Sequence, residues 1–198
     1  MKYFITAIGT DSGKTLVSAV IVHALKADYW KPIQAGKPTD TDTIKNLLGD
    51  DIFCHPEAYS LNTPASPHSA ALTEGITIRL EDIKAPVSEK DLVIEGAGGV
   101  LVPLNNNDFV IDIATKESAE LILVSNNYLG SINHTLLTLD YLKSKNYNLK
   151  GIIFNGKPNK DTEDIILHHS NCPCLLRIPE LSTVNRETII QLASELKL

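Results

Sequence analysis

The chain has 198 residues, 43% hydrophobic and 21% charged, a size and composition that fit one ordinary α/β domain covering residues 1–198. Its formal net charge of −6 argues against nucleic acid as a partner, because a general basic surface is missing. No apolar run approaches the roughly 20 residues of a membrane span, and no secretory leader precedes the first strand-like run. We therefore expect a cytoplasmic protein that is not bound to a membrane.

The first strand-like run, residues 3–7, leads into a loop that ends in Gly13, Lys14 and Thr15 and opens a helical pattern. This layout is typical of a phosphate-binding P-loop. Glycine lets backbone N–H groups approach phosphate oxygens, Lys14 can reach the β- and γ-phosphates, and the Thr15 hydroxyl can bind Mg²⁺. Ile8 stands where the strict pattern has its first glycine, so the turn must differ in detail. The alternative is a helix start without a ligand.

The next segments carry weaker signals. Residues 29–33 are interpreted as a second strand followed by a turn. Lys31 then lies at the C-terminal end of a strand, where open α/β sheets bind ligands, although an ordinary solvated lysine would look the same. Residues 39–49 predict a short helix with Asp42 in its first turn, where a carboxylate can also serve the helix dipole. Residues 53–75 are irregular, and we expect an ordered segment that covers the substrate.

A second informative run, residues 91–99, has three consecutive apolar residues that lead to Glu95 and a glycine-rich turn. The pattern indicates a strand buried on both faces. A carboxylate at this strand end, beside a P-loop, is where Mg²⁺ bound to a nucleotide would find a ligand. The alternative is a glutamate that only caps the turn.

The remaining elements complete an alternation of near-continuously apolar strands with helices. This alternation predicts an α/β, single-domain P-loop NTPase-like fold, with a mostly parallel β-sheet and helices on both faces. Asn155 follows one of the strands and could hydrogen-bond a purine edge, although Asn-Gly is also a turn signal. We expect strands at residues 120–125, 149–154 and 174–178, and helices at residues 109–117, 130–145, 161–169 and 184–198.

Together the motifs resemble one family, the dethiobiotin synthetases of biotin biosynthesis, in the family's order from residue 4 to about residue 180. The combination of E-G-A-G-G with G-x-I-N-H is far more specific than the P-loop alone. The matching stretches are residues 7–15 for G-T-D-T-x-V-G-K-T, 31–36 for K-P-[IV]-x-[AST]-G, 66–68 for S-P-H, 95–99 for E-G-A-G-G and 129–134 for L-G-x-I-N-H.

The resemblance implies a reaction: ATP- and Mg²⁺-dependent closure of the ureido ring of dethiobiotin from 7,8-diaminononanoate and CO₂ through a phosphorylated carbamate. It also implies a homodimer with the substrate at the subunit interface. The catalytic residues would be Lys31, Lys14 and Thr10, and the metal ligands Thr15, Asp42 and Glu95. ATP would be held by Asp11, Ser12, Gly13, Lys14, Thr15, Leu16, Asp42, Glu95, Gly96, Ala97, Gly98, Asn155, Gly156, Ile178, Pro179 and Glu180. The substrate would be held by Thr10, Lys31, Ala35, Gly130, Ser131, Ile132 and Asn133.

Three other functions compete with this interpretation. A P-loop switch ATPase of the partitioning or metal-cluster-assembly type shares the sheet. The loop of such a protein typically carries an extra lysine near its start, and residues 6–12 have none. An amidoligase for corrinoid acids usually carries an additional glutamine-hydrolysing domain, for which this chain has no room. A binding module without catalysis is disfavoured because Lys31 and Glu95 both follow strands.

Overall fold

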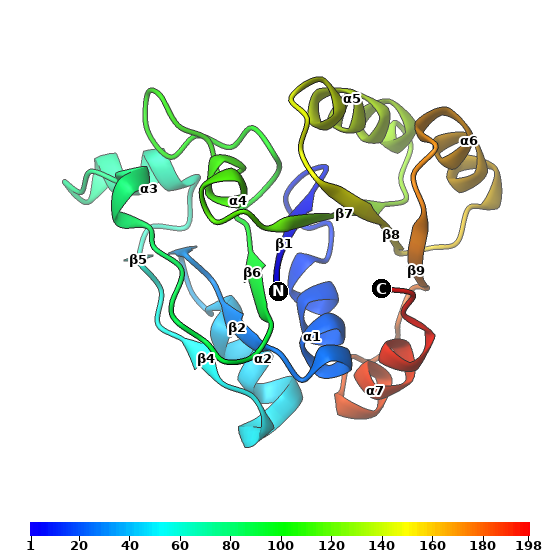
Figure 1. Ribbon diagram of the computed structural model, residues 1–198, viewed down its shortest axis with the longest axis horizontal. Helices are drawn as coiled ribbons and strands as arrows, with labels where there is room; N and C mark the ends of the chain where they lie inside the picture. Colours follow the sequence, from blue (N-terminus) through cyan, green and yellow to red (C-terminus); the bar gives the residue numbers. More distant parts are fainter.

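The computed structural model describes residues 1–198 apart from the side chain of Asp50, and Figure 1 shows a central β-sheet between layers of helices. Seven strands form the sheet in the order β4-β2-β6-β1-β7-β8-β9, and each neighbouring pair is parallel. The predicted fold class is therefore confirmed. The strands are β1 (Lys2–Ala7), β2 (Asp28–Trp30), β4 (Cys54–His55), β6 (Leu92–Glu95), β7 (Glu120–Asn126), β8 (Leu149–Asn155) and β9 (Cys174–Ile178).

Helices cover both faces of the sheet, on opposite sides in Figure 1. One face carries α1 (Lys14–Leu25), α2 (Asp40–Leu48) and α7 (Arg186–Glu195). The other carries α4 (Asp112–Lys116), α5 (Ser131–Ser144) and α6 (Lys160–Ser170). Two short 3₁₀ turns, η1 (Gly49–Asp51) and η2 (Leu80–Asp82), lie in the connections.

The central strand β1 shows why these strands read as continuous apolar runs. Successive side chains of a strand point to opposite faces. Ile5 therefore packs with the α1 layer, and Phe4 packs with the layer of α4 and α5. Because helices cover both faces, a polar residue at either position would lose its contact with water.

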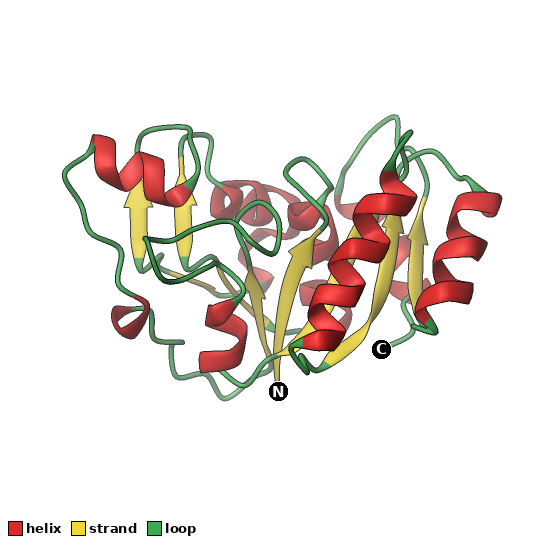
Figure 2. Ribbon diagram, turned by 90° about the horizontal axis from the view of Figure 1, so that it is seen from above, coloured by secondary structure: helices red, strands yellow, loops and turns green.

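A small second sheet differs from the expectation at residues 29–36. The predicted strand divides at Pro32, and β3 (Ile33–Ala35) extends into the residues where a turn was expected. β3 pairs in parallel with β5 (Tyr59–Leu61), which lies in the segment interpreted as irregular, and α3 (Pro67–Thr73) packs against both. Pro32 lacks an N–H donor, and its carbonyl accepts hydrogen bonds from the amides of Ala58 and Tyr59 at the start of β5. Figure 2 shows this unit beside the main sheet.

The order of the strands in the sheet determines where the site lies. β6 and β7 are the two neighbours of β1, so the chain passes from one side of β1 to the other between β6 and β7. Open α/β sheets bind ligands in the crevice that such a crossing opens at the carboxyl ends of the strands. The loops after β1, β2 and β6 meet there. In the described part of the chain, no helix combines the length and apolar character needed to cross a membrane.

Candidate active site

The P-loop joins β1 to α1 and turns at Gly13, which has a φ of 93°. A side chain at this position would overlap the amide of Asn155, so the turn requires glycine. No described side chain caps α1. Its first N–H groups and its positive dipole end are therefore available to an anionic ligand. Within the loop, the Ser12 hydroxyl donates to the carbonyl of Gly9 at 3.1 Å.

Lys14 is buried and folds back over the loop, where its ammonium donates to the Gly9 carbonyl at 3.2 Å. Burial, and secondarily the nearby charge of Lys31, lower the pKa of Lys14 to about 8. A phosphate group in the loop would supply the negative charge that favours the protonated amine. Lys14 is therefore positioned to bind an anion in the loop.

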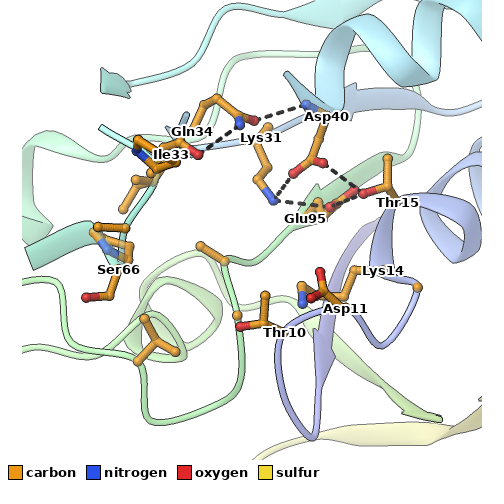
Figure 3. A pocket seen from close by; sticks show the side chains of 18 residues that line it. Thr10, Asp11, Lys14, Thr15, Lys31, Ile33, Gln34, Asp40, Ser66 and Glu95 are labelled. Carbon is orange, nitrogen blue, oxygen red and sulfur yellow. Dashed lines mark hydrogen bonds and ion pairs between the residues drawn. The ribbon is translucent and has the colours of Figure 1, made fainter. Parts of the chain in front are cut away.

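Two carboxylates and a hydroxyl converge beside the loop (Figure 3). The Thr15 hydroxyl lies 3.0 Å from Oδ1 of Asp40 and 2.9 Å from Oε1 of Glu95. Glu95 ends β6 and is 1% exposed, and its second oxygen, Oε2, accepts a hydrogen bond from the Tyr29 hydroxyl at 2.9 Å. This set of oxygen atoms can bind a hard cation.

Lys31 lies among these carboxylates. Its ammonium nitrogen is 2.6 Å from Oδ2 of Asp40 and 3.1 Å from Oε1 of Glu95, and it donates to the Gly96 carbonyl at 2.9 Å. Burial alone would lower the pKa of Lys31, but attraction to Glu95 and Asp40 raises it above the ordinary value. Burial would likewise raise the pKa of Asp40, yet Lys31 lowers it. Lysine and carboxylate are therefore both charged at neutral pH.

The structure corrects the predicted carboxylate on α2. The described lining of the cavity includes Asp40 and not Asp42, which is exposed. Thr39 caps the helix by accepting from the Asp42 amide at 3.0 Å, so Asp40 is the first helical residue. At 3.6 residues per turn, two residues correspond to about 200° around the helix, which turns Asp42 away from the site.

Gln34 fixes the loop that carries Asp40, and the sequence analysis overlooked it. Its side-chain oxygen accepts from the Asp40 amide at 3.1 Å, and its side-chain nitrogen donates to the Gly36 carbonyl at 3.1 Å. A buried glutamine on a short strand can hold a neighbouring loop in this way, but only the fold shows which loop.

These groups line a cavity of about 670 Å³. Thr10, Lys31 and Ala35, which were predicted to bind the substrate, all lie in it. So do Ala97 and Gly98 from the turn after β6 and the segment of residues 64–67, so part of the region interpreted as irregular lines the cavity. The other lining residues are Asp11, Gly13, Lys14, Thr15, Ile33, Gln34, Asp40, Glu95 and Val102.

The predicted adenine contacts lie beside the P-loop and outside the described lining of the cavity. Asn155 and Ile178 pair across β8 and β9, and the Gly156 amide donates to the Ile178 carbonyl at 3.0 Å. The Asn155 amide donates to the Ser12 carbonyl at 2.9 Å, so this side chain holds the loop. Pro179 and Glu180 follow β9 and are exposed, while Leu16 is partly buried against the core.

The predicted substrate residues on α5 do not meet Lys31 within one chain. Gly130 and Ile132 line a separate cavity of about 400 Å³ beyond β7. Gly130 precedes the helix with a φ of 105°, and no described side chain caps it. The buried Ser131 hydroxyl has no hydrogen-bond partner among the described residues, and Asn133 is exposed.

The chain is similar to a family model and to several known proteins. A family model described as "AAA domain" matches residues 1–188. The chain is 55% identical to the ATP-dependent dethiobiotin synthetase BioD of Cytophaga hutchinsonii, covering 98% of this chain and 96% of that protein. It is 43% identical to the protein of the same name from Lawsonia intracellularis, covering 100% of this chain and 98% of that protein.

Among solved structures, the fold is similar to a ParA family ATPase from Chlorobium tepidum and to the cell division ATPase MinD of Pyrococcus furiosus. Each comparison gives a TM-score of 0.62 at 16% identity, covering 98% of this chain and 97% of the other. At this level of identity the likeness establishes the P-loop fold and nothing about the reaction.

Proposed function

The chain belongs to the family of ATP-dependent dethiobiotin synthetases, and we infer that its cavity closes the ureido ring of dethiobiotin from 7,8-diaminononanoate and CO₂. The observation that carries this inference is the convergence of Lys14, Thr15, Lys31 and Glu95 on one cavity, in a chain this similar to the named relatives. The enzyme is a cyclo-ligase of biotin biosynthesis.

The reaction needs positioning and charge neutralisation more than a protein nucleophile. One amine of the substrate adds to CO₂ and loses a proton to form a carbamate. A carbamate oxygen then attacks the γ-phosphorus of ATP and ADP leaves, which gives a carbamic–phosphoric anhydride. The second amine attacks the carbonyl carbon, phosphate leaves, and the nitrogen loses a proton. Lys14 and the N–H groups of the P-loop hold the phosphates, and Lys31 lies where negative charge develops on the carbamate and the transferred group.

We assign the metal site to Thr15, Asp40 and Glu95. The donors are all oxygen atoms, as Mg²⁺ prefers. Among the described residues no group of three or more His, Cys, Asp and Glu could hold a metal by itself, so phosphate oxygens would complete the coordination. When bound, Mg²⁺ neutralises charge on the phosphates. Lys31, which contacts both carboxylates, shares that task.

Thr10, Ala35 and the segment of residues 64–67 are proposed to enclose the diamine end of the substrate, because they line the same cavity as Lys31. The nucleotide base would lie on the other side of the P-loop, against Asn155, Gly156, Ile178, Pro179 and Glu180. Support comes from the position of these residues at the ends of β8 and β9.

A homodimer is supported by an apolar groove that continues from the cavity. The groove of about 400 Å³ includes Thr10, together with Leu101 and Leu137, which are 49% and 62% exposed. Large exposed apolar side chains around one groove favour a protein partner. A second copy could bring the N-terminus of α5 to the substrate carboxylate, where the free N–H groups of the helix would bind an anion.

The switch ATPase remains the alternative function, supported by the fold of the solved neighbours alone. One experiment separates the two. The purified protein is incubated with diaminononanoate, bicarbonate, Mg²⁺ and ATP, and dethiobiotin is sought by mass spectrometry. We expect dethiobiotin and ADP in equal amounts. ATP hydrolysis without dethiobiotin, from a folded protein that binds ATP, would refute the synthetase function. The cytoplasmic location stays a prediction.

A further inference from the structure

Tyr29 makes a contact that none of the roles above requires. Its side chain is completely buried, and its hydroxyl donates to Oε2 of Glu95 at 2.9 Å. The other oxygen of the same carboxylate, Oε1, lies 2.9 Å from the Thr15 hydroxyl and 3.1 Å from the Lys31 ammonium. One oxygen thus contacts a buried tyrosine, and the other contacts two groups that line the cavity.

Strand geometry explains how the tyrosine reaches this carboxylate. Alternate side chains of a strand share one face, so Tyr29 and Lys31 leave the end of β2 on the same side. β2 and β6 are neighbours, with Tyr29 opposite Val93. Glu95 is two residues beyond Val93 and points to the same face. A phenol is long enough to span this diagonal, and Tyr29 lies outside the described lining of the cavity.

The hydrogen bond from Tyr29 matters because the carboxylate of Glu95 is buried. Glu95 is 1% exposed, and a buried carboxylate oxygen without a partner is costly, because it has lost its hydrogen bonds to water. With Oε2 held, the side chain cannot rotate to exchange its oxygens without breaking a charge-assisted hydrogen bond. Groups behind a metal ligand often set its orientation in this way.

We propose that Tyr29 is a positioning residue that holds Oε2 of Glu95 so that Oε1 stays turned toward the cation bound with ATP. This proposal rests on the metal site of the proposed function. It does not require that the reaction product be dethiobiotin, because the orientation of Glu95 matters to any ATP-dependent chemistry in this cavity.

The test is the variant Tyr29→Phe, which removes the hydroxyl and keeps the ring. Tyr3→Phe is the matched control. Tyr3 is also a buried tyrosine of the same apolar cluster, its hydroxyl lies 3.6 Å from Sδ of Met1, and it is near the opposite end of β1 from the P-loop. ADP binding is measured by calorimetry with saturating Mg²⁺ and with EDTA, and Mg²⁺ is titrated at saturating ADP.

For Tyr29→Phe we expect the Mg²⁺ concentration at half-saturation to rise about tenfold, since a hydrogen bond to a charged group is lost. ADP affinity in EDTA should stay that of the wild type, and Tyr3→Phe should match the wild type in both conditions. An unchanged Mg²⁺ titration overturns the proposal. Equal weakening with and without Mg²⁺ also overturns it, because it would mean a general structural role.

A double variant gives an independent readout. If Tyr29 acts through Glu95, then Tyr29→Phe should add no further loss of Mg²⁺ affinity in a Glu95→Gln background. Additive losses would overturn the proposal. Should Tyr29→Phe not fold, Tyr29→Met fills a similar volume without a hydroxyl and takes its place. Because these measurements use ADP and Mg²⁺ alone, a failure to make dethiobiotin would refute the proposed function and leave this result standing.

Discussion

The ammonium nitrogen of Lys31 lies 2.6 Å from Oδ2 of Asp40, and the same nitrogen lies 3.1 Å from Oε1 of Glu95. The lysine proposed to be catalytic therefore also serves as the counter-ion of the two carboxylates assigned to the metal. Glu95 is buried and Asp40 is partly exposed, and two carboxylates so close together repel each other unless a positive charge lies between them. The proposed chemistry and the stability of the site consequently depend on the same side chain, and removal of Lys31 should affect both.

We expect Lys31→Ala to lower turnover by about 10²–10³-fold, which is typical for the loss of one preorganised charge. Binding of ATP should remain, because Lys14 and the loop N–H groups are untouched. Single-turnover formation of product, measured beside calorimetric ATP binding, tests this expectation. Turnover equal to the wild type would remove Lys31 from the mechanism.

The same variant should be less stable without metal. Breaking a buried ion pair by removing one partner costs on the order of 3–5 kcal/mol, and Mg²⁺ with ADP should restore part of this loss. Denaturant unfolding in EDTA and in Mg²⁺ with ADP measures the difference. Lys160→Ala is the control, because Lys160 is in an exposed ion pair with Asp164 and should change stability little.

Asp40→Asn should raise the Mg²⁺ requirement of the reaction about tenfold or more, because it removes a charged ligand next to Thr15. Asp42→Asn changes the same functional group two residues away, on an exposed face of α2, and should behave as the wild type. The measurement is the Mg²⁺ dependence of turnover at saturating ATP. A larger effect at Asp42 than at Asp40 would contradict the assignment.

ATP affinity should fall as the pH rises through about 8. The pKa of Lys14 is lowered to about 8 by burial and by Lys31, so above that pH the free protein increasingly holds a neutral amine. Bound phosphate favours the charged amine, and the affinity should therefore drop by up to about tenfold per pH unit. Calorimetric titrations between pH 7 and pH 9.5 would show the slope.

Two variants separate Lys14 from other titrating groups. Lys14→Arg carries a guanidinium that stays protonated over this range, so its ATP affinity should not show the fall. Lys31→Met removes a like charge from the surroundings of Lys14 and should move the fall to higher pH. An identical pH profile in all three proteins would exclude Lys14 as its source.

Gly13→Ala should abolish ATP binding. The residue has a φ of 93°, and a Cβ there would overlap the Asn155 amide that holds the loop. Gly75→Ala is the control, since Gly75 also has a positive φ, 68°, but no described atom lies within 4 Å of the added carbon. Both variants should lose about 1–2 kcal/mol of stability from backbone strain, and ATP binding should be lost in Gly13→Ala alone.

The parts of the site that lie in short sequence motifs could be predicted from the sequence. Lys14 and Thr15 stand in a contiguous loop, and Lys31 and Glu95 each follow an apolar run, so parallel-sheet topology was enough to bring them together. Choosing between Asp40 and Asp42 required the first residue of α2. The signal was available in Thr39, whose spacing to Asp42 is that of an N-cap, because it makes Asp40 the first helical residue.

Other parts could not be predicted from patterns. Tyr29 and Gln34 look like strand residues, and their roles depend on which loop or carboxylate the fold places within reach. The division of the strand at Pro32 follows from pairing between β3 and β5, which are far apart in sequence. The residues from Gly130 to Asn133 remain separate from Lys31 in one chain, so their predicted role depends on a second copy.

Leu137→Asp tests that second copy. Leu137 is 62% exposed on α5 and lines the apolar groove next to Thr10, so a charge there should cost the isolated chain little stability. If the groove is the subunit interface, burying an unpaired carboxylate should dissociate the dimer, and light scattering after size exclusion should show a monomer. Leu72 is 82% exposed on α3 and lies outside the described lining of the groove, so Leu72→Asp should leave the mass unchanged.

A dissociated dimer should also show in the kinetics. Because α5 would then no longer reach a neighbouring cavity, Leu137→Asp should also raise the KM for diaminononanoate while ATP binding persists. A dimer that survives Leu137→Asp would place the interface elsewhere.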